Sequence, residues 1–186
     1  MDAVQRDGNS EVVTLGGGCF WCTEAVYLNI KGVCKVEPGY SGGKMEDADY
    51  RKVSTGRTGH AEVVQVTFDP DVITFKEILE VFFATHDPTT LNRQGADVGP
   101  QYRSVIFYYD DAQRAVAEET IDQLNGEGIW DRPIVTVVER LNAFHRAEDY
   151  HLNYYERNRE QPYCRLVIDP KLDKLTKKFK DKLRTS

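Results

Sequence analysis

The sequence predicts an α+β fold, a two-layer α/β sandwich with a mixed sheet and appended C-terminal helices. Its 186 residues are 40% hydrophobic and 11% aromatic, which suffices for the core of one globular domain. The order of strand and helix patterns as far as Tyr109 reads β-α-β-β-α-β, the ferredoxin-like split pattern. No internal repeat or long linker interrupts this order. We therefore expect residues 1–186 to form a single domain, with residues 1–10 flexible.

The first half of the chain supplies the opening β-α-β unit. Residues 11–15 form a short apolar strand that runs into three successive glycines. Helical character then extends from residue 20 to residue 29, and a second short strand over residues 33–37 is closed by Pro38 and Gly39. Residues 40–59 are rich in Gly, Ser and Asp and are expected to form a long surface loop. Loops of that length in compact domains tend to be functional.

The remaining elements follow from alternation, capping and turn residues. Residues 60–68 alternate as a strand, and residues 74–77 form a Thr-x-x-Glu capping box that opens a helix. The later elements are a polar loop, a buried strand, a helix, a strand and two helical segments, over residues 85–101, 103–109, 111–125, 134–139, 148–157 and 171–184.

The charge balance excludes several function classes. Lys and Arg number 24 against 30 Asp and Glu, and a net charge of −6 gives no electrostatic reason to bind nucleic acid. No apolar run approaches the ~20 residues that span a bilayer, and the mixed-charge N-terminus shows no signal peptide. We therefore expect a cytoplasmic monomer that binds neither nucleic acid nor membranes.

Residues 171–184 form a basic amphipathic tail. Leu172, Leu175, Phe179 and Leu183 recur there at roughly helical spacing among lysines. This pattern predicts a surface helix docked by its apolar stripe. Binding of a partner or of a membrane surface is the alternative.

Four cysteines in a chain without secretory features do not predict a disulfide scaffold. Cys19 and Cys22 form a C-x-x-C pair, whereas Cys34 and Cys164 stand alone, which matches zinc-ribbon spacing poorly. His60 and His86 also lack partners at metal-ligand spacing. Redox or nucleophilic chemistry without a bound metal or cofactor is therefore the better interpretation.

Cys19 occupies the position where a helix is expected to begin, directly after the glycines. A helix N-terminus supplies partial positive charge and free N–H groups, which favour a thiolate. We therefore predict a lowered pKa and a nucleophilic role for Cys19, with a buried structural cysteine as the alternative. Phe20 and Trp21 beside it could line a pocket for a small apolar group or could pack in the core.

Several motifs together resemble a known family. Gly18-Cys19-Phe20-Trp21 with Glu24 resembles the signature of the peptide methionine sulfoxide reductase A family. The resemblance continues through residues 39–43, 58–64, 97–104 and 147–151 and covers roughly residues 12–155. It implies reduction of methionine-S-sulfoxide, free and in proteins, by a peptide-methionine (S)-S-oxide reductase. It also implies thioredoxin as the electron donor, with dithiothreitol able to replace it in vitro.

Glu62 is the candidate general acid. It shares strand parity with Val64, Val66 and Phe68, which places its carboxyl on an apolar face where desolvation raises its pKa. A protonated carboxyl can supply the proton that the sulfoxide oxygen needs as the thiolate attacks sulfur. Pairing of Glu62 with a lysine or arginine is the alternative.

The resemblance also suggests roles for residues that the pattern alone does not single out. It implies that Tyr50 and Tyr102 hold the sulfoxide oxygen together with Glu62, and that Phe20 and Trp21 receive the terminal methyl group of the substrate. Asp97 matches a family acid near the catalytic loop. His151 and Tyr154 also fall in the matched region, where packing would explain them equally well.

Reduction leaves Cys19 as a sulfenic acid, which a second cysteine must resolve. Cys22 lies three residues beyond Cys19, on the same helical face, and is favoured. Cys164 is the alternative, while Cys34 shares strand parity with Val36 and is expected to be packed. Many family members instead place resolving cysteines in a glycine-rich tail, which this chain lacks.

Two other functions remain open at this point. The C-x-x-C pair after a strand is compatible with a thioredoxin-like dithiol–disulfide oxidoreductase that uses Cys19 and Cys22. A binding module that recognises oxidised methionine without reducing it is the third interpretation. Neither the preferred protein substrate nor the role of the basic tail follows from the sequence.

Overall fold

A six-stranded mixed sheet organises the computed structural model, which describes residues 9–185. Its strand order is β7-β6-β1-β3-β2-β8, and β6-β1-β3-β2 pair antiparallel in the ferredoxin-like split arrangement. β7 joins β6 in parallel and makes the sheet mixed. The predicted fold class is confirmed. The strands are β1 Glu11–Gly16, β2 Val33–Ser41, β3 Ala61–Phe68, β6 Val105–Tyr108, β7 Val137–Arg140 and β8 His145–Arg146.

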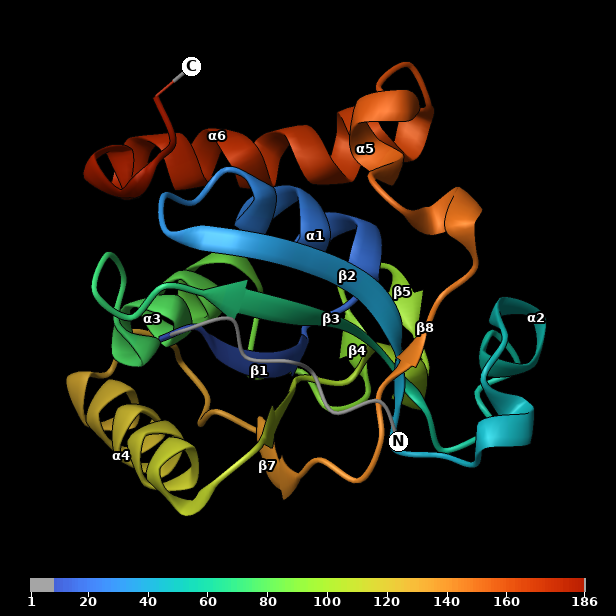
Figure 1. Ribbon diagram of the computed structural model, residues 1–186, viewed down its shortest axis with the longest axis horizontal. Coiled ribbons are helices and arrows are strands. Elements are labelled where there is room, and N and C mark those ends of the chain that lie inside the picture. The colour runs from blue at the N-terminus through green and yellow to red at the C-terminus, as the bar shows by residue number, and fades with distance from the viewer. Residues whose placement is uncertain (1–8, 186) are drawn as a thin grey trace.

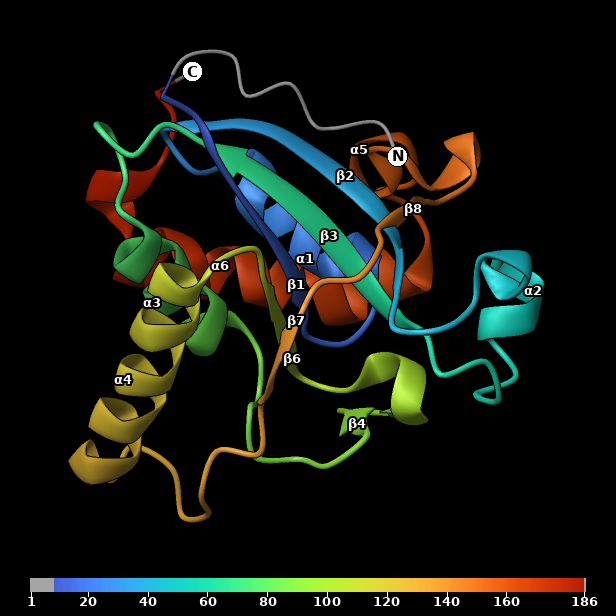
Figure 2. The same ribbon diagram turned by 60° about the horizontal axis from the view of Figure 1, so that its bottom comes forward.

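The helices cover the sheet unevenly. Figure 1 shows α1 between the sheet and α6, with α4 on the opposite side of the molecule, and in Figure 2 α2 stands apart at one end. The helices are α1 Phe20–Leu28, α2 Tyr50–Val53, α3 Phe75–Thr85, α4 Asp111–Glu127, α5 Tyr154–Arg157 and α6 Asp169–Lys178. None of the helices within residues 9–185 is both long and apolar enough to span a bilayer.

The main core lies between the sheet and the helices α1 and α3. It contains Tyr27 of α1, Val64 and Val66 of β3 and Phe82 of α3, all at most 2% exposed. The opposite face of β3 carries a smaller cluster around Val63. Because β3 is covered on both faces, a polar side chain on it is removed from water.

Local capping agrees with the sequence. The Thr74 hydroxyl accepts a hydrogen bond from the Glu77 N–H, and the Glu77 carboxylate accepts one from the Thr74 N–H, which is the predicted capping box of α3. α4 ends at Gly128 in a left-handed conformation (φ 64°). These two helix termini therefore lie close to their predicted positions.

β2 differs from its prediction in two ways. The strand continues through Pro38 to Ser41, and Pro38 is tolerated because only the short β8 lies beyond β2, near the edge of the sheet. A register shift between Val33 and Lys35 marks a bulge, after which the alternation of faces changes. Cys34 is exposed for that reason, and the prediction that it is packed is wrong.

The two long loops contain short elements that the sequence did not predict. Residues 40–59 include a 3₁₀ turn over Met45–Asp47 and the helix α2. Residues 85–101 include a small hairpin of β4 Arg93–Gln94 and β5 Asp97–Val98. A 3₁₀ turn over Pro100–Tyr102 then leads into β6.

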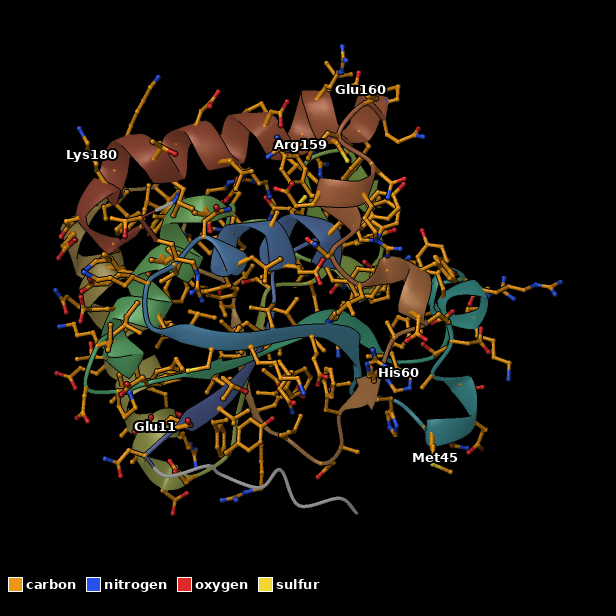
Figure 3. All side chains as sticks on the ribbon, turned by 45° about the horizontal axis from the view of Figure 1, so that its top comes forward. Glu11, Met45, His60, Arg159, Glu160 and Lys180 are labelled. Atoms are coloured by element: carbon orange, nitrogen blue, oxygen red, sulfur yellow. The ribbon has the colours of Figure 1, made fainter. Side chains whose placement is uncertain are left out.

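The C-terminal segment is divided rather than one helix over residues 171–184. A π-helical turn, Cys164–Ile168, leads into α6, and a 3₁₀ turn over Lys180–Lys182 follows it. Figure 3 shows Glu160 and Lys180 near the two ends of this segment. Cys164 therefore begins a helical turn.

The helix ends early because the chain returns to α1. Phe179 leaves helical geometry (φ −124°, ψ 38°), and the Lys31 N–H then donates to the Lys182 carbonyl at 2.8 Å. Leu183 forms a β-bridge with Ile30.

Residues 148–157 also differ from their prediction as a helical segment. They form only a 3₁₀ turn, Asp149–His151, and the single turn α5. The predicted flexibility of residues 1–10 falls mainly on residues 1–8, which lie outside the described residues.

Candidate active site

The turn from β1 to α1 places Cys19 directly before the first residue of the helix. Gly18 has φ +96°, and a Cβ there would lie 2.7 Å from the Gln94 side chain, so glycine is required on both grounds. Cys19 is the N-cap residue of α1 and is 8% exposed. The predicted position of Cys19 at a helix N-terminus is confirmed.

Glu62 of β3 lies directly beneath this helix start. The Phe20 N–H donates to Glu62 Oε1 at 3.1 Å, and the side chain is 2% exposed. Burial raises the pKa of Glu62 to about 8, although the Phe20 hydrogen bond opposes the rise. No lysine or arginine among residues 9–185 forms an ion pair with Glu62. The carboxyl is therefore mostly protonated at neutral pH, and the ion-paired alternative does not apply.

The two thiols of the C-x-x-C motif interact within α1. Burial raises the pKa of Cys19 well above its usual value, and the hydrogen bond with Cys22 and the charge of Glu62 add to the rise. The same hydrogen bond lowers the pKa of Cys22 to about 7. The prediction of a lowered pKa at Cys19 is thus wrong for the substrate-free chain. Desolvation outweighs the helix N-terminus, and the negative charge of the pair rests on Cys22.

Tyr163 links Cys22 to Asp97 through its hydroxyl group. The Tyr163 hydroxyl lies 3.5 Å from Cys22 Sγ and donates to Asp97 Oδ2 at 2.8 Å. Burial raises the pKa of Tyr163, so the hydroxyl stays protonated. A cavity of about 240 Å³ opens beside these groups, and its lining residues include Cys19, Cys22, Asp97 and Tyr163.

An aromatic cluster lies around the helix start. Trp21 stacks on Tyr154 with ring centroids 3.7 Å apart and planes at 7°, and its Nε1–H donates to His151 Nδ1 at 2.9 Å. Phe20 has no exposed surface and packs against Tyr40 and His151. Because Phe20 is covered, an apolar group that enters from solvent would contact Trp21 first.

Tyr50 and Tyr102 also face this centre. Each interacts electrostatically with both Glu62 and Cys19. Burial raises the pKa of Tyr50 to about 12 and raises that of Tyr102 as well, so both hydroxyls are protonated donors at neutral pH. Glu148 helps to position Tyr50, because its carboxylate accepts the Tyr50 N–H at 3.0 Å.

Glu24 ties the C-terminal segment to α1. Its carboxyl is 1% exposed and accepts the N–H groups of Asn153 at 3.0 Å and Tyr154 at 3.3 Å. Burial raises the pKa of Glu24 to about 7, against the effect of these two hydrogen bonds. The motif residue Glu24 thereby fixes the backbone of the residue that stacks on Trp21.

The two remaining cysteines differ in position. Cys164 is fully buried, and the charge of Cys22 contributes to a raised pKa at Cys164, after the larger effect of burial. Cys34 is exposed at the start of β2, and its thiol contacts the Gly32 carbonyl. Cys164 therefore lies within the electrostatic reach of Cys22, whereas Cys34 forms no part of this cluster.

Three residues of this centre were not foreseen from the sequence. Glu148 lies inside the matched segment 147–151, which could have indicated it. Tyr163 is one of ten tyrosines, and only its position next to Cys164 could have drawn attention to it. Lys171 lines the cavity of Cys19 and Cys22, although the sequence pattern predicts only that it belongs to a docked surface helix. Within residues 9–185 no three His, Cys, Asp or Glu side chains are grouped as metal ligands, and a metal-free site stays a prediction.

Comparison with known proteins agrees with this geometry. The chain matches the family described as peptide methionine sulfoxide reductase over residues 11–183. A peptide methionine sulfoxide reductase MsrA from Sulfolobus acidocaldarius is 56% identical over 172 residues, which are 92% of this chain and 97% of that protein. The structure of reduced Mxr1 from Saccharomyces cerevisiae superimposes with a TM-score of 0.77 at 35% identity, covering 85% of this chain and 91% of the other.

A second yeast structure shows Mxr1 in complex with Trx2. It superimposes with a TM-score of 0.53 at 28% identity and covers 80% of this chain and 86% of the other. The family match spans almost all of the described residues, and the archaeal relative shares more than half of its aligned residues with this chain. The chain therefore belongs to the peptide methionine sulfoxide reductase family.

Proposed function

We propose that this chain reduces methionine-S-sulfoxide, free and in proteins, with Cys19 as nucleophile and Glu62 as general acid. Family membership supports the reductase activity. The observation that carries the residue assignment is the burial of a largely protonated Glu62 carboxyl beside the Cys19 N-cap position. A nucleophile and an acid at one point are what sulfoxide reduction requires.

The first step converts the sulfoxide to a thioether. The proton of the Cys19 thiol passes to the Cys22 thiolate, and Cys19 sulfur attacks the sulfoxide sulfur. Glu62 protonates the departing oxygen, while the hydroxyls of Tyr50 and Tyr102 donate to it. Methionine leaves, reduced by two electrons, and the oxygen remains on Cys19 as a sulfenic acid.

Substrate binding uses both sides of Cys19. Trp21, with Phe20 beneath it, would contact the methyl group, and the cavity beside Asp97 would receive the rest of the residue. The cavity holds about 240 Å³, enough for a methionine side chain but not for a folded segment. We therefore propose that protein substrates present the oxidised residue on an exposed, flexible segment.

The second step returns the enzyme to its dithiol form. Cys22 first releases to solvent the proton that it took from Cys19. The Cys22 thiolate then attacks the Cys19 sulfenic acid, an S–S bond replaces the S–O bond, and the hydroxide leaves as water after it takes up one proton. Thioredoxin then reduces the disulfide, and the complex of yeast Mxr1 with Trx2 supports this donor. We assign resolution to Cys22, with Cys164 as the alternative.

The proposal also covers the domain organisation, the localisation, the oligomeric state and the cofactor requirement. We propose that the chain works as a single catalytic domain and a cytoplasmic monomer, without a bound metal or cofactor. Thioredoxin or dithiothreitol is then sufficient as reductant.

One comparison separates the reductase from its two rivals. Methionine formation from methionine sulfoxide with dithiothreitol is measured beside the reduction of insulin disulfides. The proposal requires rapid methionine formation and no insulin reduction above the dithiothreitol background. Insulin reduction alone would indicate a dithiol oxidoreductase. Binding of the sulfoxide without turnover would indicate a recognition module.

A further inference from the structure

Lys171 differs from most lysines of the C-terminal segment, and Lys182, which is also half-buried, is paired with Glu77. Lys171 is half-buried near the start of α6, whereas Lys174, Lys177, Lys178 and Lys180 are exposed. Its side chain lines the cavity that Cys19 and Cys22 also line. It also lines a second, smaller cavity together with Cys22 and His86. The basic tail therefore places Lys171 at the active site, whereas its other lysines are exposed or, at Lys182, paired with Glu77.

The packing of α6 fixes this lysine over α1. Leu175 is 1% exposed and Phe179 is 8% exposed, and both belong to the main core. Figure 1 shows α6 lying along α1, the helix that carries Cys22 and that Cys19 caps. Among residues 9–185, no carboxylate forms an ion pair with Lys171. Its charge is therefore available to the thiols.

Most titratable groups around Cys22 are uncharged at neutral pH, so they do not offset the positive charge of Lys171. Burial lowers the pKa of His86 to about 4, so this ring is neutral, and it is hydrogen-bonded to the Phe82 carbonyl and the Ser104 hydroxyl. Glu62 is mostly protonated below pH 8, and Tyr163 and Cys164 keep their protons because burial raises the pKa of each.

Two charged groups then remain near Cys22. The Cys19 hydrogen bond lowers the pKa of Cys22 most, and burial opposes it. Of the two charges, Lys171 lowers this pKa more strongly than Asp97 raises it. Asp97 also accepts the Tyr163 hydroxyl, which spreads part of its negative charge. A cation beside a thiol is a known means of favouring the thiolate.

We propose that Lys171 is a positioning residue that acts through Cys22, holding it as the thiolate that attacks the Cys19 sulfenic acid. The proposal rests on the function proposed above and gives the basic tail a catalytic purpose. The step forms the Cys19–Cys22 bond and breaks the S–O bond, and the released hydroxide takes one proton from solvent. Its rate follows the fraction of Cys22 present as thiolate.

A charge series at position 171 tests the proposal without substrate. Lys171→Arg, Lys171→Met and Lys171→Glu are titrated by thiolate absorbance near 240 nm, and Cys22→Ser identifies the contribution of Cys22. The midpoint for Cys22 should stay near wild type in the arginine variant. It should rise by about one pH unit in the methionine variant and further in the glutamate variant. Lys174→Met is the matched control and should match wild type.

A single turnover tests the consequence. Each protein is mixed with one equivalent of methionine-S-sulfoxide without reductant, and the sulfenic acid and the disulfide are followed by rapid trapping and mass spectrometry. At pH 6.5 the sulfenic acid of Lys171→Met should persist about three- to tenfold longer than in wild type, and the two should converge near pH 9.5. A merely structural effect would not vanish at high pH.

The two proposals fail in different ways. Unchanged Cys22 midpoints across the charge series, or equal sulfenic acid lifetimes in Lys171→Met and Lys174→Met, would overturn the role of Lys171. Absence of methionine from wild-type enzyme would instead overturn the proposed function, while the titration would still report on Lys171. If the methionine variant unfolds, the arginine and glutamate variants decide the question by themselves.

Discussion

Glu62 shows how burial alone can prepare a side chain for acid chemistry. The residue is 2% exposed on a strand covered on both faces, and desolvation brings its pKa to about 8. It accepts one backbone hydrogen bond, from Phe20, but no cation pairs with it in the described part of the chain. A carboxyl in this state can donate a proton at the pH of the cell.

Glu62→Gln should fold normally and lose most of the activity. The amide can still donate a hydrogen bond to the sulfoxide oxygen but cannot deliver a proton, and a general acid contributes about 10²–10⁴-fold. Steady-state kcat/KM with dithiothreitol measures the loss, and circular dichroism checks the fold. A variant with more than half of the wild-type rate would remove Glu62 from the acid role.

The pH dependence of wild-type kcat/KM should be bell-shaped. The rate should rise as the thiol pair loses its first proton near pH 7, the pKa of Cys22, and should fall as Glu62 loses its proton near pH 8. Because Glu62 must be protonated to act, Glu62→Gln should abolish the alkaline limb alone. Persistence of that limb in the variant would assign it to another group.

At the scale of elements, the C-terminal segment is held on α1 by two different means. Leu175 of α6 and Phe179 directly after it pack in the core, while the carboxyl of Glu24 accepts the N–H groups of Asn153 and Tyr154 at the start of α5. The packing of α6 positions Lys171, and the hydrogen bonds to Glu24 position Tyr154. Both therefore bear on the active site from outside it.

Leu175→Ala should destabilise the protein by about 2–5 kcal/mol, as expected for a leucine that is 1% exposed. Leu166→Ala is the matched control, because Leu166 is 76% exposed and its truncation should change stability by no more than about 0.5 kcal/mol. Urea unfolding at pH 7 measures both. Equal midpoints for the two variants would show that α6 is not docked.

Glu24→Gln should change how stability depends on pH. The pKa of Glu24 is raised to about 7 in the folded chain, so the folded state binds more protons than the unfolded state between pH 4.5 and pH 7. Its contribution is therefore fully present below pH 4.5 and is lost as the pH rises through 7, by an amount on the order of 1–3 kcal/mol. Wild type minus Glu24→Gln should show that slope in urea unfolding. A pH-independent difference would contradict it.

Sequence patterns predicted the features that depend on residues close together along the chain. The parity of Glu62 in its strand indicated a buried carboxyl, and residues 74–77 gave the capping box. Parity failed at Cys34, because a bulge between Val33 and Lys35 changes the face that it occupies. A bulge depends on the partner strand, and the sequence of β2 alone does not reveal it.

Features that depend on contacts between distant segments could not be predicted from local sequence patterns. Tyr163 meets Asp97 across 66 positions and Cys22 across 141 positions, and no local pattern encodes either contact. The high pKa of Cys19 has the same origin. A helix N-terminus favours a thiolate, but burial of Cys19 in the folded chain reverses this preference, and Glu62 on a distant strand adds to the rise of the pKa.

At the scale of the whole molecule, the chain brings a dithiol, an acid and a basic tail to one end of a split β-α-β core. The thiols come from α1, the acid from β3, and Tyr163 and Lys171 from the C-terminal segment. Recycling by thioredoxin must reach a disulfide that lies at this junction. Which cysteine completes that disulfide decides how far the C-terminal segment must move.

Cys22→Ser should lose thioredoxin-dependent turnover by at least about tenfold and should still form one equivalent of methionine in a single turnover. Cys22 is favoured because its thiol is already hydrogen-bonded to Cys19, and a serine cannot form the disulfide. Cys164→Ser is the matched control and should recycle at the native rate. Peptide mapping that finds a Cys19–Cys164 bond in wild type would reverse the assignment.

The central claim is that Cys19 takes the oxygen from methionine-S-sulfoxide, and one stoichiometric reaction tests it most directly. Reduced enzyme is mixed with each separated sulfoxide epimer without a reductant, and the methionine released is counted against the oxidised cysteines found by mass spectrometry. The account predicts one methionine per chain from the S epimer only, with the oxidation on Cys19 and then on a Cys19–Cys22 disulfide. Methionine formation by Cys19→Ser, or an oxidation that never passes through Cys19, would contradict it.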